Sequence, residues 1–73
     1  MKPKLSRMTT HIIEFSTDEG TVVGKAVRTS VRDDWFVGYL TIDEKWYNAA
    51  TVSSTLPEVT QRKLVTSILK GLM

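Results

Sequence analysis

The chain has 73 residues, of which 41% are hydrophobic and 25% are charged, and it carries a net charge of +2 and no cysteine. A chain of this length forms one domain with a thin core, because folding buries only about 60% of its unfolded surface. Without cysteine it has neither disulfides nor thiolate metal sites, and a small core leaves no room for a deep catalytic cleft. We therefore expect a cytoplasmic protein without enzymatic activity, metal or cofactor.

The first nine residues combine Pro3 with the basic residues Lys2, Lys4 and Arg7 and show no apolar pattern. We predict a flexible basic tail over residues 1–9, followed by a single domain over residues 10–73. The tail lacks the apolar segment of a signal peptide. No apolar run in the chain approaches the roughly 20 residues that span a bilayer, so we expect no membrane partner.

Four segments have the alternation and the β-branched and aromatic content of strands, namely residues 10–16, 21–31, 35–42 and 45–52. Short polar turns join them. The turn over residues 16–20 is predicted to be a type I turn that closes with Gly20 in the left-handed conformation. Short connections of this kind favour an antiparallel meander, which we expect to contain three to four strands.

Residues 55–73 have the spacing of one C-terminal α-helix. The segment from Thr55 to Glu58 fits a capping box, in which each of these two side chains accepts a hydrogen bond from the other residue's amide. The apolar stripe of the predicted helix consists of Leu64, Val65, Ile68, Leu69 and Leu72. We predict an α+β fold in which this helix packs on one face of the small sheet.

The strand predicted over residues 35–42 is apolar on both faces. Trp35 and Tyr39 lie on one face, and Phe36 and Leu40 lie on the other. One helix covers one face of a sheet, so some aromatic surface should stay exposed. The pattern leaves open which of the two faces the helix covers. In the strand predicted over residues 45–52, one face carries Trp46, Asn48, Ala50 and Val52, and Tyr47 lies on the other.

Aromatic and basic side chains are the candidates for a partner-binding surface. Aromatic residues contribute much of the energy at interfaces, because they bury a large area and lose few rotamers. The candidates are Trp35, Tyr39, Trp46, Tyr47, Arg28 and Arg32. His11 lacks the context of a catalytic residue, and we predict that it lies on the surface. The acidic pairs at residues 18–19, 33–34 and 43–44 are interpreted as turn residues rather than metal ligands.

The basic start KPKLSR, the segments TVVGKAVRTS, DDWFVGYLTI and KWYNAATV, and the closing helix together resemble a known family. They are similar to the very small transcription regulators that lytic phages make against the host RNA polymerase. The resemblance covers the whole chain and includes no diagnostic motif. It implies a non-enzymatic protein that docks on the β′ subunit of bacterial RNA polymerase in the host cytoplasm. It also implies that binding blocks initiation and promotes antitermination.

Two other functions compete with a protein partner. A sheet with aromatic and arginine side chains binds nucleic acid in several known modules, by base stacking and phosphate contact. The basic residues of this chain are dispersed among acidic pairs, which would repel phosphate, so we favour a protein partner over nucleic acid. Homodimerisation through the exposed apolar face is the third possibility and stays open.

Overall fold

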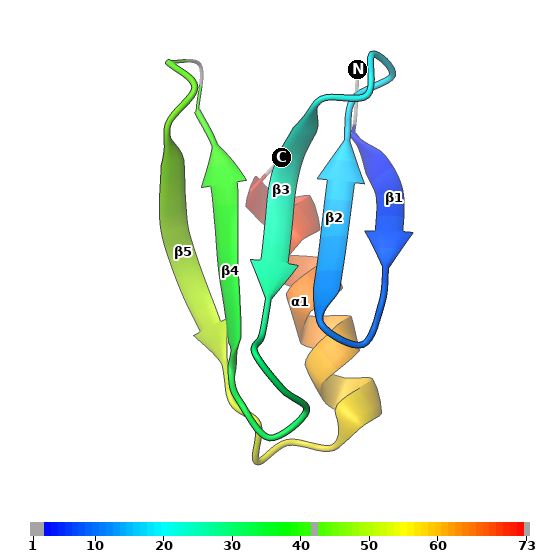
Figure 1. Ribbon diagram of the computed structural model, residues 1–73, viewed down its shortest axis with the longest axis vertical. Helices are drawn as coiled ribbons and strands as arrows, with labels where there is room; N and C mark the ends of the chain where they lie inside the picture. The colour runs from blue at the N-terminus through cyan, green and yellow to red at the C-terminus, as the bar shows by residue number, and fades with distance from the viewer. Residues whose placement is uncertain (1–2, 42, 73) are drawn as a thin grey trace.

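The computed structural model describes residues 3–41 and 43–72, which form one antiparallel sheet and one helix (Figure 1). The elements are β1 (Lys4–Met8), β2 (Ile12–Ser16), β3 (Val22–Val27), β4 (Trp35–Leu40), β5 (Trp46–Val52) and α1 (Glu58–Leu72). The strand order is β1-β2-β3-β4-β5, so each strand pairs with its neighbours in sequence. The predicted α+β meander is confirmed, but it has five strands instead of three to four.

Strand β1 lies where the sequence predicts a flexible tail, and that prediction is wrong for residues 4–8. All five side chains of β1 are exposed, so the strand lacks the apolar alternation that a sequence pattern can detect. Pairing with β2 holds it in place, together with a 2.6 Å hydrogen bond between the hydroxyls of Ser6 and Ser16. The turn after β1 is closed by Thr9, whose hydroxyl accepts from the amides of His11 and Ile12. Residues 1 and 2 lie outside the described residues.

The turns at the other end of the sheet differ in how well they match the prediction. Gly20 has a φ of 86°, so its predicted left-handed conformation after the turn is confirmed. Between β4 and β5, Glu44 has a φ of 61°, a conformation in which a residue with a Cβ is strained. The strand predicted over residues 35–42 ends at Leu40, and Ile42 lies outside the described residues. The strand predicted over residues 21–31 ends at Val27.

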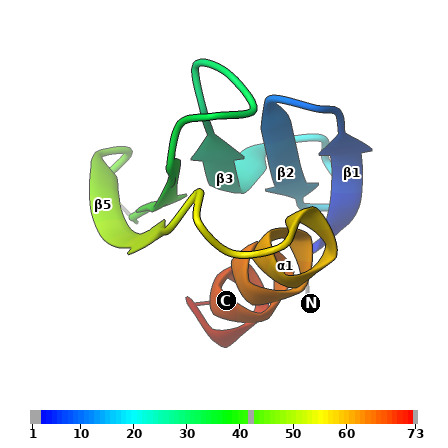
Figure 2. The same ribbon diagram turned by 90° about the horizontal axis from the view of Figure 1, so that it is seen from below.

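Helix α1 covers one face of the sheet, as Figure 2 shows. Side chains alternate along a strand, so Trp35 and Val37 of β4 point toward α1, and Phe36 points to the opposite face. The buried residues between the two layers are Ile13, Phe15, Ala26, Trp35, Val37, Val52, Val65 and Leu69. The structure thus decides the question that the sequence leaves open, because the helix covers the face of Trp35.

The buried side of α1 differs in part from the predicted apolar stripe. Its buried residues are Gln61, Val65 and Leu69. The stripe is wrong for Leu64 and Leu72, which are 41% and 39% exposed. Ile68 packs against the core while partly exposed. The polar Gln61 takes the buried position nearest the start of the helix, where it accepts a hydrogen bond from Arg28.

The first turn of α1 also differs from the predicted capping box. The Glu58 carboxylate binds the guanidinium groups of Arg28 and Arg62, at 2.8 and 3.0 Å, instead of reaching back to Thr55. The amide of Thr55 donates to the hydroxyl of Ser53. A charged hydrogen bond to a buried arginine is stronger than one to a neutral amide, which explains why Glu58 turns toward Arg28.

Candidate functional site

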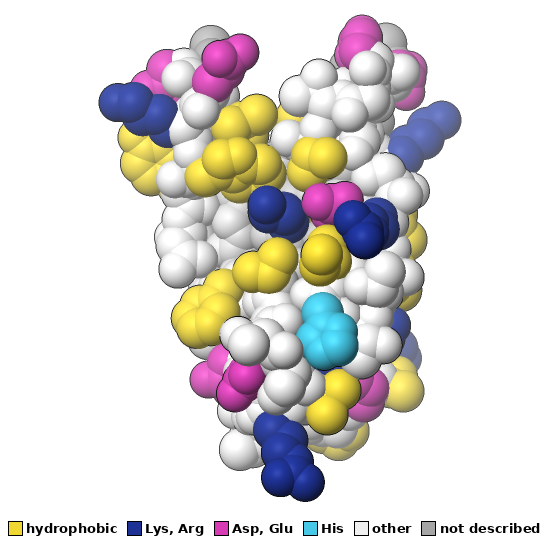
Figure 3. Space-filling model, viewed as in Figure 1, with side chains coloured by type: hydrophobic (Ala, Val, Ile, Leu, Met, Phe, Trp, Pro, Cys, Tyr) yellow, Lys and Arg dark blue, Asp and Glu magenta, His cyan; other side chains and the backbone are white. Residues whose placement is uncertain are grey.

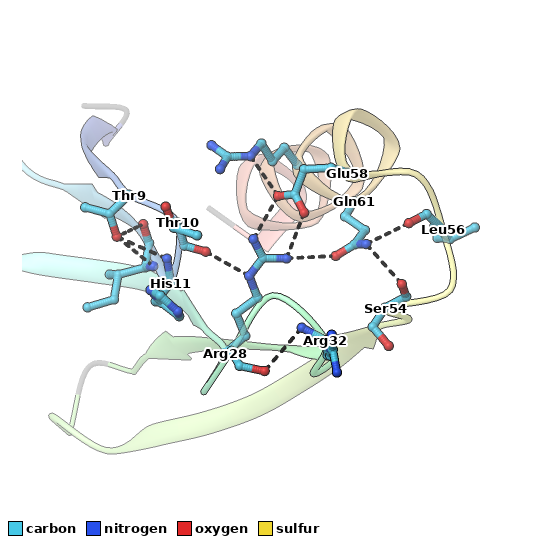
Figure 4. A network of polar contacts seen from close by, with 12 residues as sticks. Thr9, Thr10, His11, Arg28, Arg32, Ser54, Leu56, Glu58 and Gln61 are labelled. Carbon is cyan, nitrogen blue, oxygen red and sulfur yellow. Dashed lines mark hydrogen bonds and ion pairs between the residues drawn. The ribbon is translucent and has the colours of Figure 1, made fainter.

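Arg28, one of the predicted partner-binding residues, lies inside the protein (Figure 4). Its side chain has 0% exposed surface. Nε donates to the carbonyl of Thr10 at 2.8 Å, and Nη1 donates to Oε1 of Gln61 at 3.1 Å. The two Nη atoms also donate to the two carboxylate oxygens of Glu58, at 3.0 and 2.8 Å. Arg28 therefore joins the loop between β1 and β2 to the first turn of α1, and it is not accessible to a partner.

Glu58 and Gln61 complete this network from the helix. Nε2 of Gln61 donates to the carbonyls of Leu56 and Ser54, at 2.7 and 3.3 Å, so the segment before α1 is held as well. The Glu58 side chain is 44% exposed. The hydrogen bond from Arg28 lowers the pKa of the Glu58 carboxyl below its ordinary value of 4.5, and Arg62 acts in the same direction. The network is therefore ionised at neutral pH.

Trp35, a second predicted contact residue, lies directly beneath Arg28. The guanidinium carbon of Arg28 is 4.4 Å from the centroid of the Trp35 ring, which is a cation–π contact. The Trp35 residue has 0% exposed surface. Two of the six predicted contact residues thus form part of the core, and a partner cannot reach them without unfolding the domain.

Tyr39 and Tyr47 form a pair on the helix side of the sheet. They are opposite one another in the register of β4 and β5, and their rings stack with centroids 6.0 Å apart. Tyr39 shares the face of Val37, because the two residues are separated by one position in β4. Tyr47 is 47% exposed and Tyr39 is partly buried. This pair is accessible, but it lies on the opposite face from Trp46.

A β-bulge in β5 determines the position of Trp46. The register between β4 and β5 shifts at Ala49, which is an extra residue without an opposite partner. The alternation of side chains is interrupted there, so the prediction that Trp46 and Val52 share a face is wrong. Val52 is 2% exposed and points into the core, whereas Trp46 is 45% exposed on the other face.

We call the face of the sheet opposite α1 the outer face, and Figure 3 shows hydrophobic side chains gathered on it. Val27, Phe36 and Trp46 are 37%, 47% and 45% exposed. The ammonium group of Lys25 lies 5.0 Å from the centroid of the Trp46 ring. A shallow hollow of about 300 Å³ lies here, lined by Lys25, Val27, Phe36, Gly38, Trp46, Tyr47 and Asn48. The outer face is thus aromatic, and Lys25 beside Trp46 lies opposite Glu14 of β2 in the register.

Gly38 lines this hollow and keeps β4 and β5 close together. A Cβ atom on Gly38 would lie 2.9 Å from the carbonyl oxygen of Tyr47 and 3.9 Å from the ring of Trp46. The first distance is too short for a carbon–oxygen contact, so a side chain at this position would push the strands apart. The close approach of the two backbones therefore requires glycine.

Three residues of the outer face, Lys25, Val27 and Phe36, are absent from the predicted set. The alternation of β4 does place Phe36 on the other face of the strand from Trp35. Knowing which face the helix covers would therefore have identified Phe36 as an exposed residue. Lys25 and Val27 are ordinary strand residues in the sequence, and only the register brings them beside β4. Arg32 is exposed in the loop between β3 and β4 and does not line the hollow. His11 is exposed, which confirms the surface position predicted for it.

Within residues 3–41 and 43–72, no three side chains of the metal-binding types are grouped so that they could hold a metal ion. No helix in the same part of the chain has the length and apolar character needed to cross a membrane. Comparisons with protein-family models, curated proteins and solved structures find no match.

Proposed function

We propose that this protein is a non-enzymatic binding module that docks its outer face on a larger protein and thereby inhibits or redirects it. The observation that carries the proposal is the exposed aromatic pair of Phe36 and Trp46 on the face that α1 leaves uncovered. Both rings line the same hollow, and large apolar side chains exposed together on one face of a small domain mark an interaction surface, because leaving them in water has no structural benefit.

The exposed area of these two rings is large enough to anchor a complex. Phe36 and Trp46 are 47% and 45% exposed. A large aromatic side chain has roughly 200 Å² of surface, so each has about 100 Å² left to bury. At about 25 cal/mol per Å², complete burial contributes about 2.5 kcal/mol for each residue. Contributions of this size are those of interface hot spots.

The proposed partner is the β′ subunit of bacterial RNA polymerase. The resemblance of the sequence to small phage regulators supports this choice, and the outer face supplies a surface of suitable chemistry. In this function the bound protein would block initiation at promoters and promote antitermination. The ammonium group of Lys25 lies beside Trp46 and opposite Glu14 of β2, and it favours a partner surface that presents a carbonyl or other acceptor group next to an apolar one.

The test is to measure the affinity of the protein and its variants for purified bacterial RNA polymerase core enzyme by biolayer interferometry. We expect Phe36→Ala and Trp46→Ala each to weaken binding at least about tenfold, since each removes roughly 2 kcal/mol or more. Leu64→Ala is the matched control, because Leu64 is 41% exposed on α1. It should change the affinity less than about twofold. Thermal unfolding of each variant shows whether the fold is retained.

Unchanged affinity in both aromatic variants, with the fold intact, would contradict docking through the outer face. If the protein does not bind purified RNA polymerase, the proposed partner is wrong. Two exposed aromatic rings next to Lys25 on an open sheet also favour nucleic acid as a second candidate. In that case a labelled single-stranded RNA should bind with an affinity that falls steeply with salt, and Phe36→Ala and Trp46→Ala should weaken that binding.

A further inference from the structure

Strand β1 forms one edge of the sheet, and β2 is its only neighbour in the strand order. The amide and carbonyl groups on the other side of β1 therefore have no strand partner within the described structure. Its five side chains are all exposed. An edge of this kind pairs readily with an extended segment of another chain, which adds a strand to the sheet.

A groove lies beside this edge. Helix α1 packs against β2, β3, β4 and β5, and the groove remains between the helix and β1. Its volume is about 470 Å³, and it is lined by Met8, Arg62, Lys63, Thr66, Ser67 and Lys70. Three of these residues are basic and none is acidic. Met8, which is 43% exposed, adds an apolar contact at the strand.

The acidic residues close in sequence cancel only part of this charge. Glu58 lies one helical turn before Arg62 and pairs with it as well as with the buried Arg28, so Lys63 and Lys70 carry the remaining positive charge of the groove. Glu14 is opposite Arg7 on the neighbouring strand β2. Since Phe15 of β2 points to the core, Glu14 and Arg7 lie on the outer face, away from the groove. The groove itself is therefore a positively charged channel along a free strand edge.

We infer that β1 and this groove bind an extended acidic peptide by strand addition, at a site separate from the outer face. The main chain of the peptide pairs with β1, and every second side chain points toward α1. These side chains are about 7 Å apart along a strand, so the long, flexible side chains of Lys63 and Lys70 can each reach one of them. Acidic side chains at these positions match the charge of the groove.

The same features disfavour two other occupants. A second copy of β1 would bring Lys4 and Arg7 of the two chains together, so like charges oppose pairing between identical edges. A nucleic acid strand would match the charge, but the groove lining contains no aromatic ring for base stacking. Nucleic acid also lacks the main-chain groups that pair with a strand edge.

The probe is a fluorescently labelled peptide of about nine residues that alternates glutamate with threonine, titrated with the full chain and followed by anisotropy. We expect saturable binding that weakens about tenfold or more in the double variant Lys63→Glu with Lys70→Glu. The matched control is Arg32→Glu with Lys45→Glu, which changes the net charge equally at two exposed residues outside the groove lining. It should change the affinity less than about threefold. Circular dichroism confirms that both variants fold.

A second pair of measurements identifies strand addition itself. N-methylation of alternate peptide residues blocks main-chain donors on one edge of the strand only. We expect one methylated series to lose binding and the other to retain it, and we expect rapidly exchanging amides of β1 to become protected in the complex. Equal weakening in both double variants would show non-specific charge attraction. Absence of binding, insensitivity to both methylated series, or tighter binding of single-stranded DNA to the groove would each overturn the inference.

Discussion

Substitutions at Arg28 and Arg32, the two arginines predicted to contact a partner, should differ strongly in their effect on the stability of the fold. Arg28 has a fully buried side chain with hydrogen bonds to Thr10, Glu58 and Gln61. Arg32 is exposed in the following loop. We predict that changes at Arg28 destabilise the fold strongly, whereas the same changes at Arg32 hardly alter its stability.

The magnitude follows from what each substitution removes. Arg28→Lys keeps the charge and can still bind Glu58, but it cannot also reach the carbonyl of Thr10 or lie flat on Trp35. The loss of one charged hydrogen bond and of the stacking contact costs about 2–3 kcal/mol. Arg28→Ala removes the whole buried group and should cost about 3–5 kcal/mol. A domain of this length is stable by roughly 4–11 kcal/mol, so Arg28→Ala removes a large part of that stability.

The assay is urea unfolding followed by circular dichroism. For a small domain the slope is about 1 kcal/mol per molar urea, so Arg28→Lys should lower the midpoint by about 2 M or more. Arg32→Lys and Arg32→Ala are the controls, and each should stay within about 0.5 kcal/mol of the parent. Equal midpoints for Arg28→Lys and Arg32→Lys would refute the structural role assigned to Arg28.

Two further predictions concern single charged residues. The pKa of Glu58 is lowered in the fold, so its stabilising effect is complete above its unfolded pKa and is lost as the pH falls through the folded value. In urea titrations at several pH values, Glu58→Gln should therefore be less stable than the parent at pH 7, and the difference should shrink below about pH 4.5. Glu44 has a φ of 61°, so Glu44→Gly should raise the free energy of unfolding by about 1 kcal/mol, whereas Glu44→Ala should not. If Glu44→Gly leaves the thermal midpoint unchanged, the backbone at residue 44 is not strained.

Local features of this chain were readable in the sequence because they depend on neighbouring residues. The alternation of β-branched and aromatic residues predicts β2, β3, β4 and β5 to within a few positions. Gly20 marks a turn that needs a left-handed residue, and the structure has it there. The four-residue spacing that includes Val65 and Leu69 predicts the C-terminal helix and part of its buried side. Short connections then predict the meander.

Exposed elements left no such signal. Strand β1 has no buried side chain, so its sequence looks like a polar tail, and it forms only because the edge of β2 is available for pairing. The same limit applies to the Glu58 side chain. Its position three residues after Thr55 is that of a capping box, but the buried guanidinium of Arg28 competes for the carboxylate and binds it.

The candidate site depended on tertiary structure to a greater extent than the fold. Of the candidate contact residues, Trp46 and Tyr47 are exposed, whereas Trp35 and Arg28 are buried. Phe36, which is not one of those candidates, lies exposed on the outer face. Two long-range events decided this. Packing of α1 selected which face of β4 became the core, and the extra residue in β5 turned Trp46 to the opposite face. A pattern with a period of two residues determines that the faces differ, whereas the covered face and the register depend on contacts between distant segments.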